Sequence, residues 1–324
     1  MPFEGVAPAA VAERLTMVDA RLGRGTYTDD TEMAIALAES LLERGCIEAR
    51  ALGRAFADAH DPRRGYGAGT TEVLRLVRSG LHPHDAAGSL FGGQGSQGNG
   101  AAMRVAPVAV RYADDRGALA MAARESARVT HAHPLAVDAA AVQAAAIAAA
   151  LRGEAPLDAA LAAATTAELK GRLTNAARLL DSELQPAEVA AALGNRPTGH
   201  QSVPAAIYSA AAHESVEVAI TFAVRCGGDT DTLGAMAGAV AAARTGASAS
   251  PRTGSTRSRK GPRGAVTSSD SPTASPLPAG AKETVAWRRS RAPPARGPPR
   301  RRRLHGVVAA PSRRRRRCRR CRPG

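Results

Sequence analysis

Two acidic clusters, about 200 residues apart, constrain the fold of this chain most strongly. They are Thr28-Asp29-Asp30-Thr31 and Asp229-Thr230-Asp231-Thr232, and each runs directly into an apolar pattern with helical spacing. Carboxylates at a helix start are stabilised by the helix dipole and by free backbone amides. Four carboxylates that converge from two helix starts offer the all-oxygen ligation that suits magnesium or manganese. The pairing therefore predicts metal-assisted hydrolysis.

Each cluster alone could instead be a helix cap, because Thr and Asp are common capping residues. The adjacent Asp29 and Asp30, however, place two like charges at one helix start, and a bound cation relieves that repulsion. Two such clusters in one chain favour metal binding over capping. The ions would polarise a substrate oxygen and activate water.

The apolar residues of the chain favour helices. Hydrophobic residues make up 44% of the chain but aromatic residues only 3%, so the apolar content is largely Ala, Leu and Val. This mix suits helices that pack closely through small side chains. The Ala-rich stretch 135–168 predicts two buried helices that are broken near residues 153–156. We therefore expect residues 1–245 to form successive helices.

The composition changes completely at about Gly246. Residues 246–324 hold 22 of the 44 Lys and Arg but only two acids, Asp270 and Glu283, among many Pro, Ser and Gly. Such a segment cannot bury enough apolar surface to offset its chain entropy, so we expect a disordered tail. Its arginines would bind nucleic acid non-specifically through counterion release, whereas the remaining 245 residues carry a net charge of −5. An out-of-frame reading of a GC-rich gene would give the same composition, and that alternative stays open.

The sequence shows no sign of membrane insertion or secretion. No apolar run reaches the roughly 18 residues that a membrane span needs. The N-terminus lacks the basic start and apolar core of a signal peptide. We expect a cytoplasmic protein with no membrane partner.

Two glycine-rich segments interrupt the helical pattern, at residues 65–69 and 92–100. At such points the backbone turns sharply or approaches a ligand closely. The second segment matches G-x-G-x-x-G, but no strand precedes it, which argues against a dinucleotide-binding Rossmann site. Its amides could still cradle phosphates ahead of the helix expected near Asn99, and a flexible surface loop is the alternative.

Taken in order, these motifs resemble the ADP-ribosylglycohydrolase family. The matching pieces are Tyr27-Thr-Asp-Asp-Thr31, Arg64-Gly-Tyr-Gly-Ala-Gly69, Gly95-Ser-Gln-Gly-Asn-Gly-Ala-Ala-Met-Arg-Val-Ala106, Thr130-His131 and Gly227-Gly-Asp-Thr-Asp-Thr232. The likeness covers roughly residues 3–243 and is strongest to the ADP-ribosylserine hydrolase branch. It implies an all-α fold: a single compact multi-helix domain at residues 1–245 around a binuclear metal centre, with the basic tail at 246–324 outside it.

The resemblance also implies roles for individual residues. Two Mg²⁺ ions, or Mn²⁺, would be bound by Thr28, Asp29, Asp30, Asp229, Asp231 and Thr232. The diphosphate and distal ribose would be held by Gly95, Ser96, Gly98, Asn99 and His131. The catalytic carboxylates would be Glu4, Asp29 and Asp30, with Glu4 as a gate to the site. Water would attack the anomeric carbon through an oxocarbenium-like transition state, and which carboxylate is the base stays open.

The predicted function is magnesium-dependent hydrolysis of the bond between ADP-ribose and a protein side chain or small acceptor. The partner would be an ADP-ribosylated protein or an ADP-ribose derivative. Three departures from the family pattern keep alternatives open: the chain begins almost at Glu4, it turns into the tail where the family continues with helices, and Gln97 replaces an aromatic. The alternatives are a degenerate member that binds ADP-ribose without turnover, or a nucleic-acid binder that acts through the basic tail.

Overall fold

The chain is helical throughout the part that the structure describes. The structure is a computed structural model, and it describes residues 3–11, 22–23 and 25–246. Within these residues there is no β-strand, and a single isolated bridge joins Gly98 to Thr198. The prediction of an all-α fold is therefore confirmed. The predicted tail lies outside the described residues apart from Gly246, so the domain division at residue 245 stays a prediction.

Fourteen α-helices and two short 3-10 helices make up the described part of the chain. They are, in order, η1 (Pro8–Ala10), α1 (Asp29–Arg44), α2 (Ala49–Ala59), η2 (Pro62–Arg64), α3 (Ala68–Arg78), α4 (Pro83–Gly93), α5 (Gly100–Met103), α6 (Ala106–Arg111), α7 (Arg116–Arg128), α8 (Pro134–Leu151), α9 (Pro156–Ala163), α10 (Ala167–Leu179), α11 (Pro186–Leu193), α12 (Gly199–Ala211), α13 (Val216–Arg225) and α14 (Thr230–Thr245). Four of the α-helices start with proline, whose missing amide costs nothing at that position. Gly45 ends α1 in the left-handed conformation that glycine commonly adopts just after a helix.

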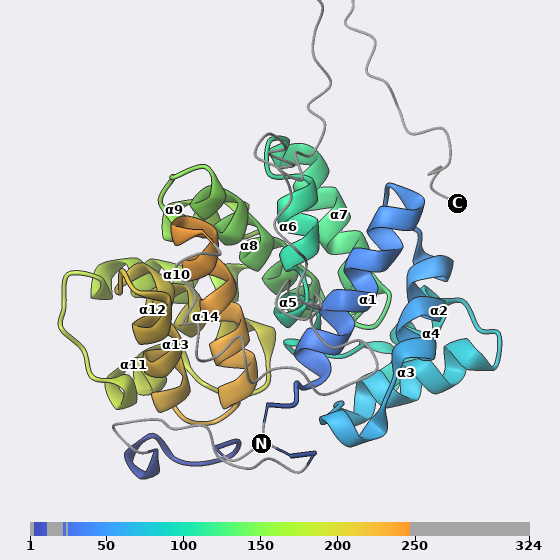
Figure 1. Cartoon of the computed structure of the whole chain (residues 1–324), viewed down its shortest axis with the longest axis horizontal. Helices are drawn as coiled ribbons and strands as arrows, with labels where there is room; N and C mark the ends of the chain where they lie inside the picture. The colour runs from blue at the N-terminus through green and yellow to red at the C-terminus, as the bar shows by residue number, and fades with distance from the viewer. Residues whose placement is uncertain (1–2, 12–21, 24, 247–324) are drawn as a thin grey trace, which may run out of the picture. The chain divides into compact units, whose positions relative to one another are not determined.

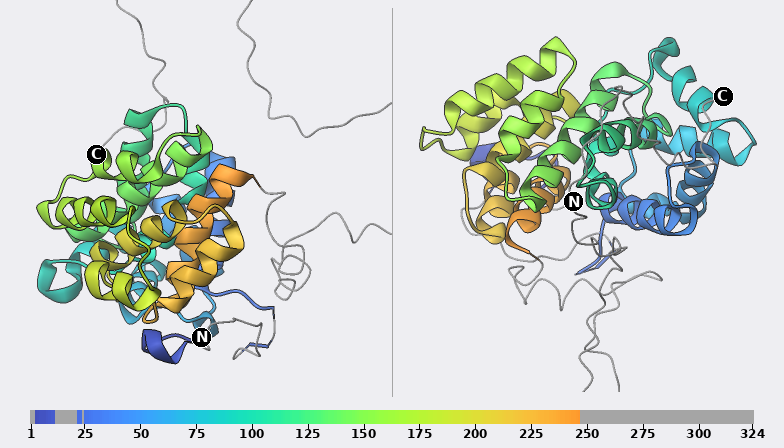
Figure 2. Two further views of the ribbon diagram at one scale, coloured as in Figure 1. Left: turned by 90° about the vertical axis from the view of Figure 1, so that its left-hand side faces the viewer. Right: turned by 90° about the horizontal axis from the view of Figure 1, so that it is seen from above.

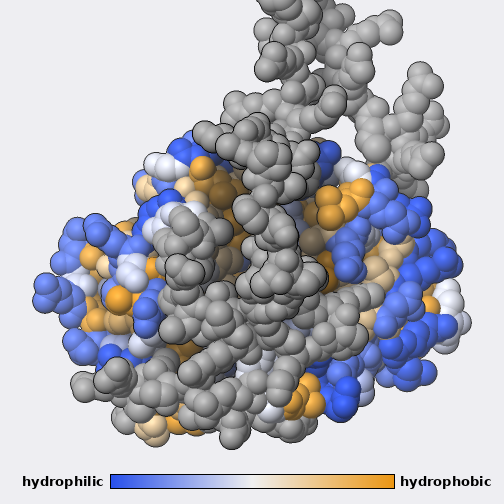
Figure 3. All heavy atoms as spheres, in the orientation of Figure 1, coloured by the Kyte–Doolittle hydropathy of each residue, from blue (hydrophilic) through white to orange (hydrophobic). Residues whose placement is uncertain are grey.

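Helix α8 forms the centre of the core. It packs against α5, α6, α7, α9, α10, α12 and α14. Most of its buried positions are alanines, so the neighbouring helices approach closely. Figures 1 and 2 show α1 to α4 grouped to one side of it and α10 to α13 to the other. On the face drawn in Figure 3, hydrophilic side chains are interrupted by apolar patches. The predicted break between two Ala-rich helices is confirmed, because α8 ends at Leu151 and α9 begins at Pro156.

The expectation that no apolar run is long enough for a membrane span is wrong for α8. This helix has 18 residues and a mean hydropathy of 1.7, which suffice by length and composition, but 78% of it is buried inside the fold. Asp138 and Gln143 interrupt its apolar sequence without lowering the average enough to exclude a span. Gln143 Nε2 donates to the Met236 carbonyl at 3.0 Å, and Asp138 accepts hydrogen bonds from residues 165 and 166. The helix is therefore the core helix of a helical domain.

Asp138 ties α8 to the start of α10. Its carboxylate accepts hydrogen bonds from the backbone and hydroxyl groups of Thr165 and Thr166, at 2.7–2.9 Å, and lies 3.2 Å from Arg124. Burial alone would raise the pKa of Asp138, but these hydrogen bonds outweigh it and hold the pKa below its usual value.

Asp138→Ala should destabilise the fold by about 3 kcal/mol at pH 7, because several buried donors lose their acceptor. Because the pKa of Asp138 is lower in the folded protein than in the unfolded chain, its carboxylate stabilises the fold at a pH above the unfolded pKa. This stabilisation is lost as the pH falls, so the difference between the variant and wild type should shrink below about pH 4. Urea unfolding at both pH values measures it. Asp158→Ala, at an exposed position on α9, is the matched control and should change stability by less than about 0.5 kcal/mol. Equal effects of the two substitutions at pH 7 would contradict this assignment.

Candidate metal centre

The first acidic cluster forms the first turn of α1. Thr28 is the N-cap residue in an extended conformation, and its hydroxyl donates to Asp30 Oδ2 at 2.7 Å. Asp29 and Asp30 are the first two residues of the helix, and both are buried. Asp30 Oδ1 is also buried, yet it has no hydrogen-bond partner. A buried carboxylate oxygen without a donor is costly unless a cation or water binds it.

The second cluster forms the start of α14 after two glycines. Gly227 and Gly228 have φ values of 70° and 69°, and a Cβ atom at either position would overlap backbone atoms of Val6 or Asn195. The backbone can therefore approach both segments only because these residues are glycines. Asp229 is the N-cap residue, and its backbone amide donates to the Asn195 carbonyl at 3.0 Å.

The two clusters and the N-terminal segment meet in space. Gly5 donates to the Gly228 carbonyl at 2.8 Å, and Gly228 donates to the Val6 carbonyl at 2.9 Å. This pairing brings Glu4 to the second cluster, where ligand oxygens of Glu4, Asp229 and Asp231 all lie within 4.8 Å of one another. Asp231 Oδ1 is buried without a hydrogen-bond partner, like Asp30 Oδ1.

The carboxylates of the two clusters raise one another's pKa. Burial raises the pKa of Asp29 to about 8, and the neighbouring carboxylates add to the shift. Burial and the charge of Asp231 raise the pKa of Asp30 to about 6, although hydrogen bonds from the hydroxyls of Thr28 and Thr232 oppose the shift. The pKa of Asp231 also rises to about 6, through burial and the charges of Asp229 and Glu4. So many buried acids at one point fit a divalent cation, which would neutralise them and bind their free oxygens.

The glycine loop lies beside the second cluster. Asn99 Nδ2 donates to Asp229 Oδ2 at 2.6 Å and to Ser202 Oγ at 3.1 Å, so this predicted substrate-binding residue also orients an acid of the second cluster. Ser96 Oγ accepts from the Gly98 amide at 3.1 Å. Gly95, at φ 75°, packs so closely against residues 132 and 133 that a Cβ atom would lie 2.7 Å from the His133 amide nitrogen. The helix expected near Asn99 is present as α5, but it has only four residues.

His131 lies against the same loop. A Cβ atom at Gly98 would lie 3.1 Å from His131 Nε2, and one at Gly100 would lie 3.0 Å from its Cε1, so both glycines make room for the ring. His131 Nδ1 is 2.7 Å from the Thr130 hydroxyl. Burial, helped by the charge of Arg104, lowers the pKa of His131 to about 3. The imidazole is therefore neutral near pH 7 and offers hydrogen bonds rather than charge.

Arg104 is a residue whose structural role the sequence did not reveal. It is fully buried and donates to the Gly100 carbonyl at 3.0 Å, to the Ser126 carbonyl at 3.0 Å and to the Thr130 hydroxyl at 2.8 Å. Because Thr130 accepts from Arg104, its own proton is available for His131 Nδ1. Arg104 thus holds the glycine loop through the Gly100 carbonyl and holds His131 through the Thr130 hydroxyl. Its only sequence signal is its place in the Gly95 to Ala106 motif.

Known proteins of similar sequence and structure share one family. A family model described as ADP-ribosylglycohydrolase matches residues 1–263. The human protein named ADP-ribosylhydrolase ARH3 is 34% identical over 258 residues, which cover 67% of this chain and 70% of that protein. The Danio rerio protein of the same name is 32% identical over 259 residues, covering 67% and 69%. A solved structure titled ADP-ribosylglycohydrolase-related protein complex aligns with a TM-score of 0.60 and 30% identity, covering 79% of this chain and 85% of that one.

The all-α fold, the buried acidic centre and the matching family model together define a class of glycosidic-bond hydrolases. The chain belongs to the ADP-ribosylglycohydrolase family, and it is a hydrolase of glycosidic bonds. The family resemblance read from the sequence motifs is therefore confirmed.

Removing one acid should stabilise the metal-free protein. The pKa of Asp231 is higher in the folded protein than in the unfolded chain, so its protonated form stabilises the fold. This stabilisation is complete below about pH 4 and is lost as the pH rises through about 6, where Asp231 ionises. At pH 8, Asp231→Asn should therefore raise the unfolding free energy of metal-free protein by about 1–2 kcal/mol. Added Mg²⁺ should raise the melting temperature of wild type far more than that of the variant. Scanning calorimetry in EDTA and in magnesium measures both effects, and a variant that responds to magnesium like wild type would contradict the metal centre.

Proposed function

We propose that this protein uses two Mg²⁺ ions, or Mn²⁺, to hydrolyse the bond between ADP-ribose and a protein side chain or small acceptor. The observation that carries the proposal is the convergence of buried, unpartnered carboxylate oxygens at the starts of α1 and α14, next to the glycine loop. Thr28, Asp29, Asp30, Asp229, Asp231 and Thr232 would hold the ions. Bound there, the metal would supply Lewis-acid stabilisation of oxygen anions and lower the pKa of water.

The chain's own residues account for the remaining steps. The loop around Gly95 and Gly98 would hold the diphosphate through the Ser96 hydroxyl and through the Gly98 amide, which would exchange Ser96 Oγ for a phosphate oxygen. The Gly95 amide donates to the Leu90 carbonyl, so Gly95 would shape the loop rather than donate to the ligand. Neutral His131 would add a hydrogen bond without repelling or attracting the phosphates. The loop is held rigid by Asn99 and Arg104, so the ribose would be presented to the carboxylates in one orientation.

Glu4, Asp29 and Asp30 are the candidate catalytic carboxylates. Glu4 is exposed and lies beside Asp229 and Asp231, so it would meet both solvent water and a substrate bound at these acids. A carboxylate there would accept the proton of the attacking water and stabilise the oxocarbenium-like transition state. The cytoplasmic location and nucleic-acid binding by the basic tail stay predictions.

Asp229→Ala and Asp231→Ala should each lower the rate of ADP-ribose release by at least about 100-fold, because each removes a metal ligand. The assay follows free ADP-ribose by chromatography, with peptides that carry ADP-ribose on serine or on arginine and with an acetyl ester of ADP-ribose. Wild-type activity should disappear in EDTA and return with magnesium, and Asp158→Ala should keep the wild-type rate. Binding of ADP-ribose in a calorimeter with no product from any of these substrates would instead support a non-catalytic, ADP-ribose-binding member.

A further inference from the structure

A buried arginine connects the start of α1 to the loop that faces it. Arg64, only 4% exposed, lies at the end of η2. Its NH1 donates to the Tyr27 carbonyl at 2.7 Å, and its Nε lies 2.9 Å from Glu32 Oε1. The guanidinium also stacks on the Tyr27 ring, with Cζ 4.1 Å from the ring centroid. Arg64 therefore holds the residue that immediately precedes the predicted ligand Thr28.

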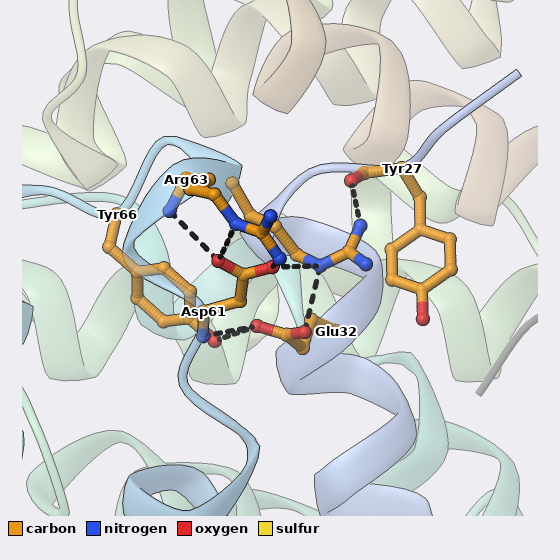
Figure 4. A network of polar contacts seen from close by, with 6 residues as sticks. Tyr27, Glu32, Asp61, Arg63 and Tyr66 are labelled. Carbon is orange, nitrogen blue, oxygen red and sulfur yellow. Dashed lines mark hydrogen bonds and ion pairs between the residues drawn. The ribbon is translucent and has the colours of Figure 1, made fainter. Parts of the chain in front are cut away.

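Glu32 receives contacts from the same loop on its other side. Its Oε2 accepts from the Tyr66 hydroxyl at 2.8 Å and from the Asp61 amide at 3.2 Å. Figure 4 shows Glu32 between Asp61, Tyr66 and the arginine that reaches Tyr27. Because Glu32 is one turn after Asp29 on α1, these bonds fix the first turn of the helix against residues 61–66. The buried positive charge of Arg64 and the buried negative charge of Glu32 compensate each other.

The loop held in this way touches the metal centre itself. Gly65 has a φ of 99°, and a Cβ atom there would lie 3.6 Å from Asp29 Oδ1. The backbone next to Arg64 thus lies directly against one of the predicted metal ligands. Outer contacts of this kind orient ligating carboxylates, and their loss commonly weakens metal binding by about 10–100-fold.

We propose that Arg64 is a positioning residue for the metal centre: through the Tyr27 carbonyl and Glu32 it holds Thr28, Asp29 and Asp30 in a ligating arrangement. The inference rests on the proposed metal-dependent function and adds a determinant of metal affinity to it. Arg64 itself forms an ion pair with Glu32 and a hydrogen bond to the Tyr27 carbonyl, so it acts by orientation and is not a catalytic residue.

The test must separate positioning from a general loss of stability. Arg64→Met alone leaves the Glu32 charge buried without its partner, so both the melting temperature and the affinity for Mg²⁺ should fall. The double variant Arg64→Met with Glu32→Met removes both charges. Its melting temperature in EDTA should lie above that of Arg64→Met, because no unpaired charge stays buried, and below that of wild type, because the Tyr66 hydroxyl and the Asp61 amide lose their acceptor. Its Mg²⁺ affinity, measured with magnesium chloride by isothermal titration calorimetry, should stay at least about 10-fold weaker than that of wild type. Saturating magnesium should restore most of kcat.

Arg75→Met is the matched control, since Arg75 is an exposed arginine on α3 that pairs only with Glu72 among the described contacts. It should bind magnesium like wild type. A double variant that is as stable as wild type and binds magnesium equally well would overturn the proposal. If the methionine variants do not fold, Arg64→Lys keeps the charge but cannot bond both Tyr27 and Glu32; unchanged magnesium affinity there would overturn it as well.

The measurements on wild type separate a failure of the proposed function from a failure of the positioning role of Arg64. A wild-type protein that binds no magnesium and releases no ADP-ribose would contradict the function itself. A wild-type protein that does both, while the Arg64 variants bind magnesium equally well, would contradict only the positioning role.

Discussion

Repulsion among buried carboxylates is the constraint on which the rest of this structure depends. Two aspartates at the start of α1 and two at the start of α14 face one another, and their pKa values lie above the usual range because of burial and mutual charge. An arrangement that costs stability in the metal-free protein is expected where function requires it. Hydrogen bonds from Asn99 to Asp229 and from Thr28 to Asp30 hold these acids in place against their repulsion.

Small residues allow the distant segments to meet. Gly227 and Gly228 let the α14 start approach Val6 and Asn195, and the glycines around His131 let the loop close over its ring. The alanines of α8 bring seven other helices against one central helix. The low aromatic content of the chain thus has a structural meaning, since bulky side chains at these positions would keep the segments of the site apart.

Local features of this fold were predictable from sequence, and long-range contacts were not. The helix starts at Asp29 and Thr230 follow the Thr and Asp pattern of the two clusters, and the break between α8 and α9 follows from glycine and proline. The bond from Asn99 to Asp229 joins residues 130 positions apart, and no periodicity in the sequence reports such a pairing. Arg64 and Arg104 were visible only as members of motifs, because a buried arginine and a surface arginine look alike in a sequence. The apolar length of α8 was misjudged because Asp138 and Gln143 interrupt its apolar run, although its burial in the core was predicted from its alanines.

The most direct test of the central claim is proton release when magnesium binds. The raised pKa values mean that the metal-free site holds protons near pH 7, and a cation must displace them to bind carboxylates. Titration calorimetry of magnesium chloride into the protein, in buffers of different ionisation enthalpy at pH 7, reports the number released. The account predicts release of about one proton per site, declining toward zero above about pH 9. A binding enthalpy that is the same in every buffer at pH 7, or no binding at all, would contradict it.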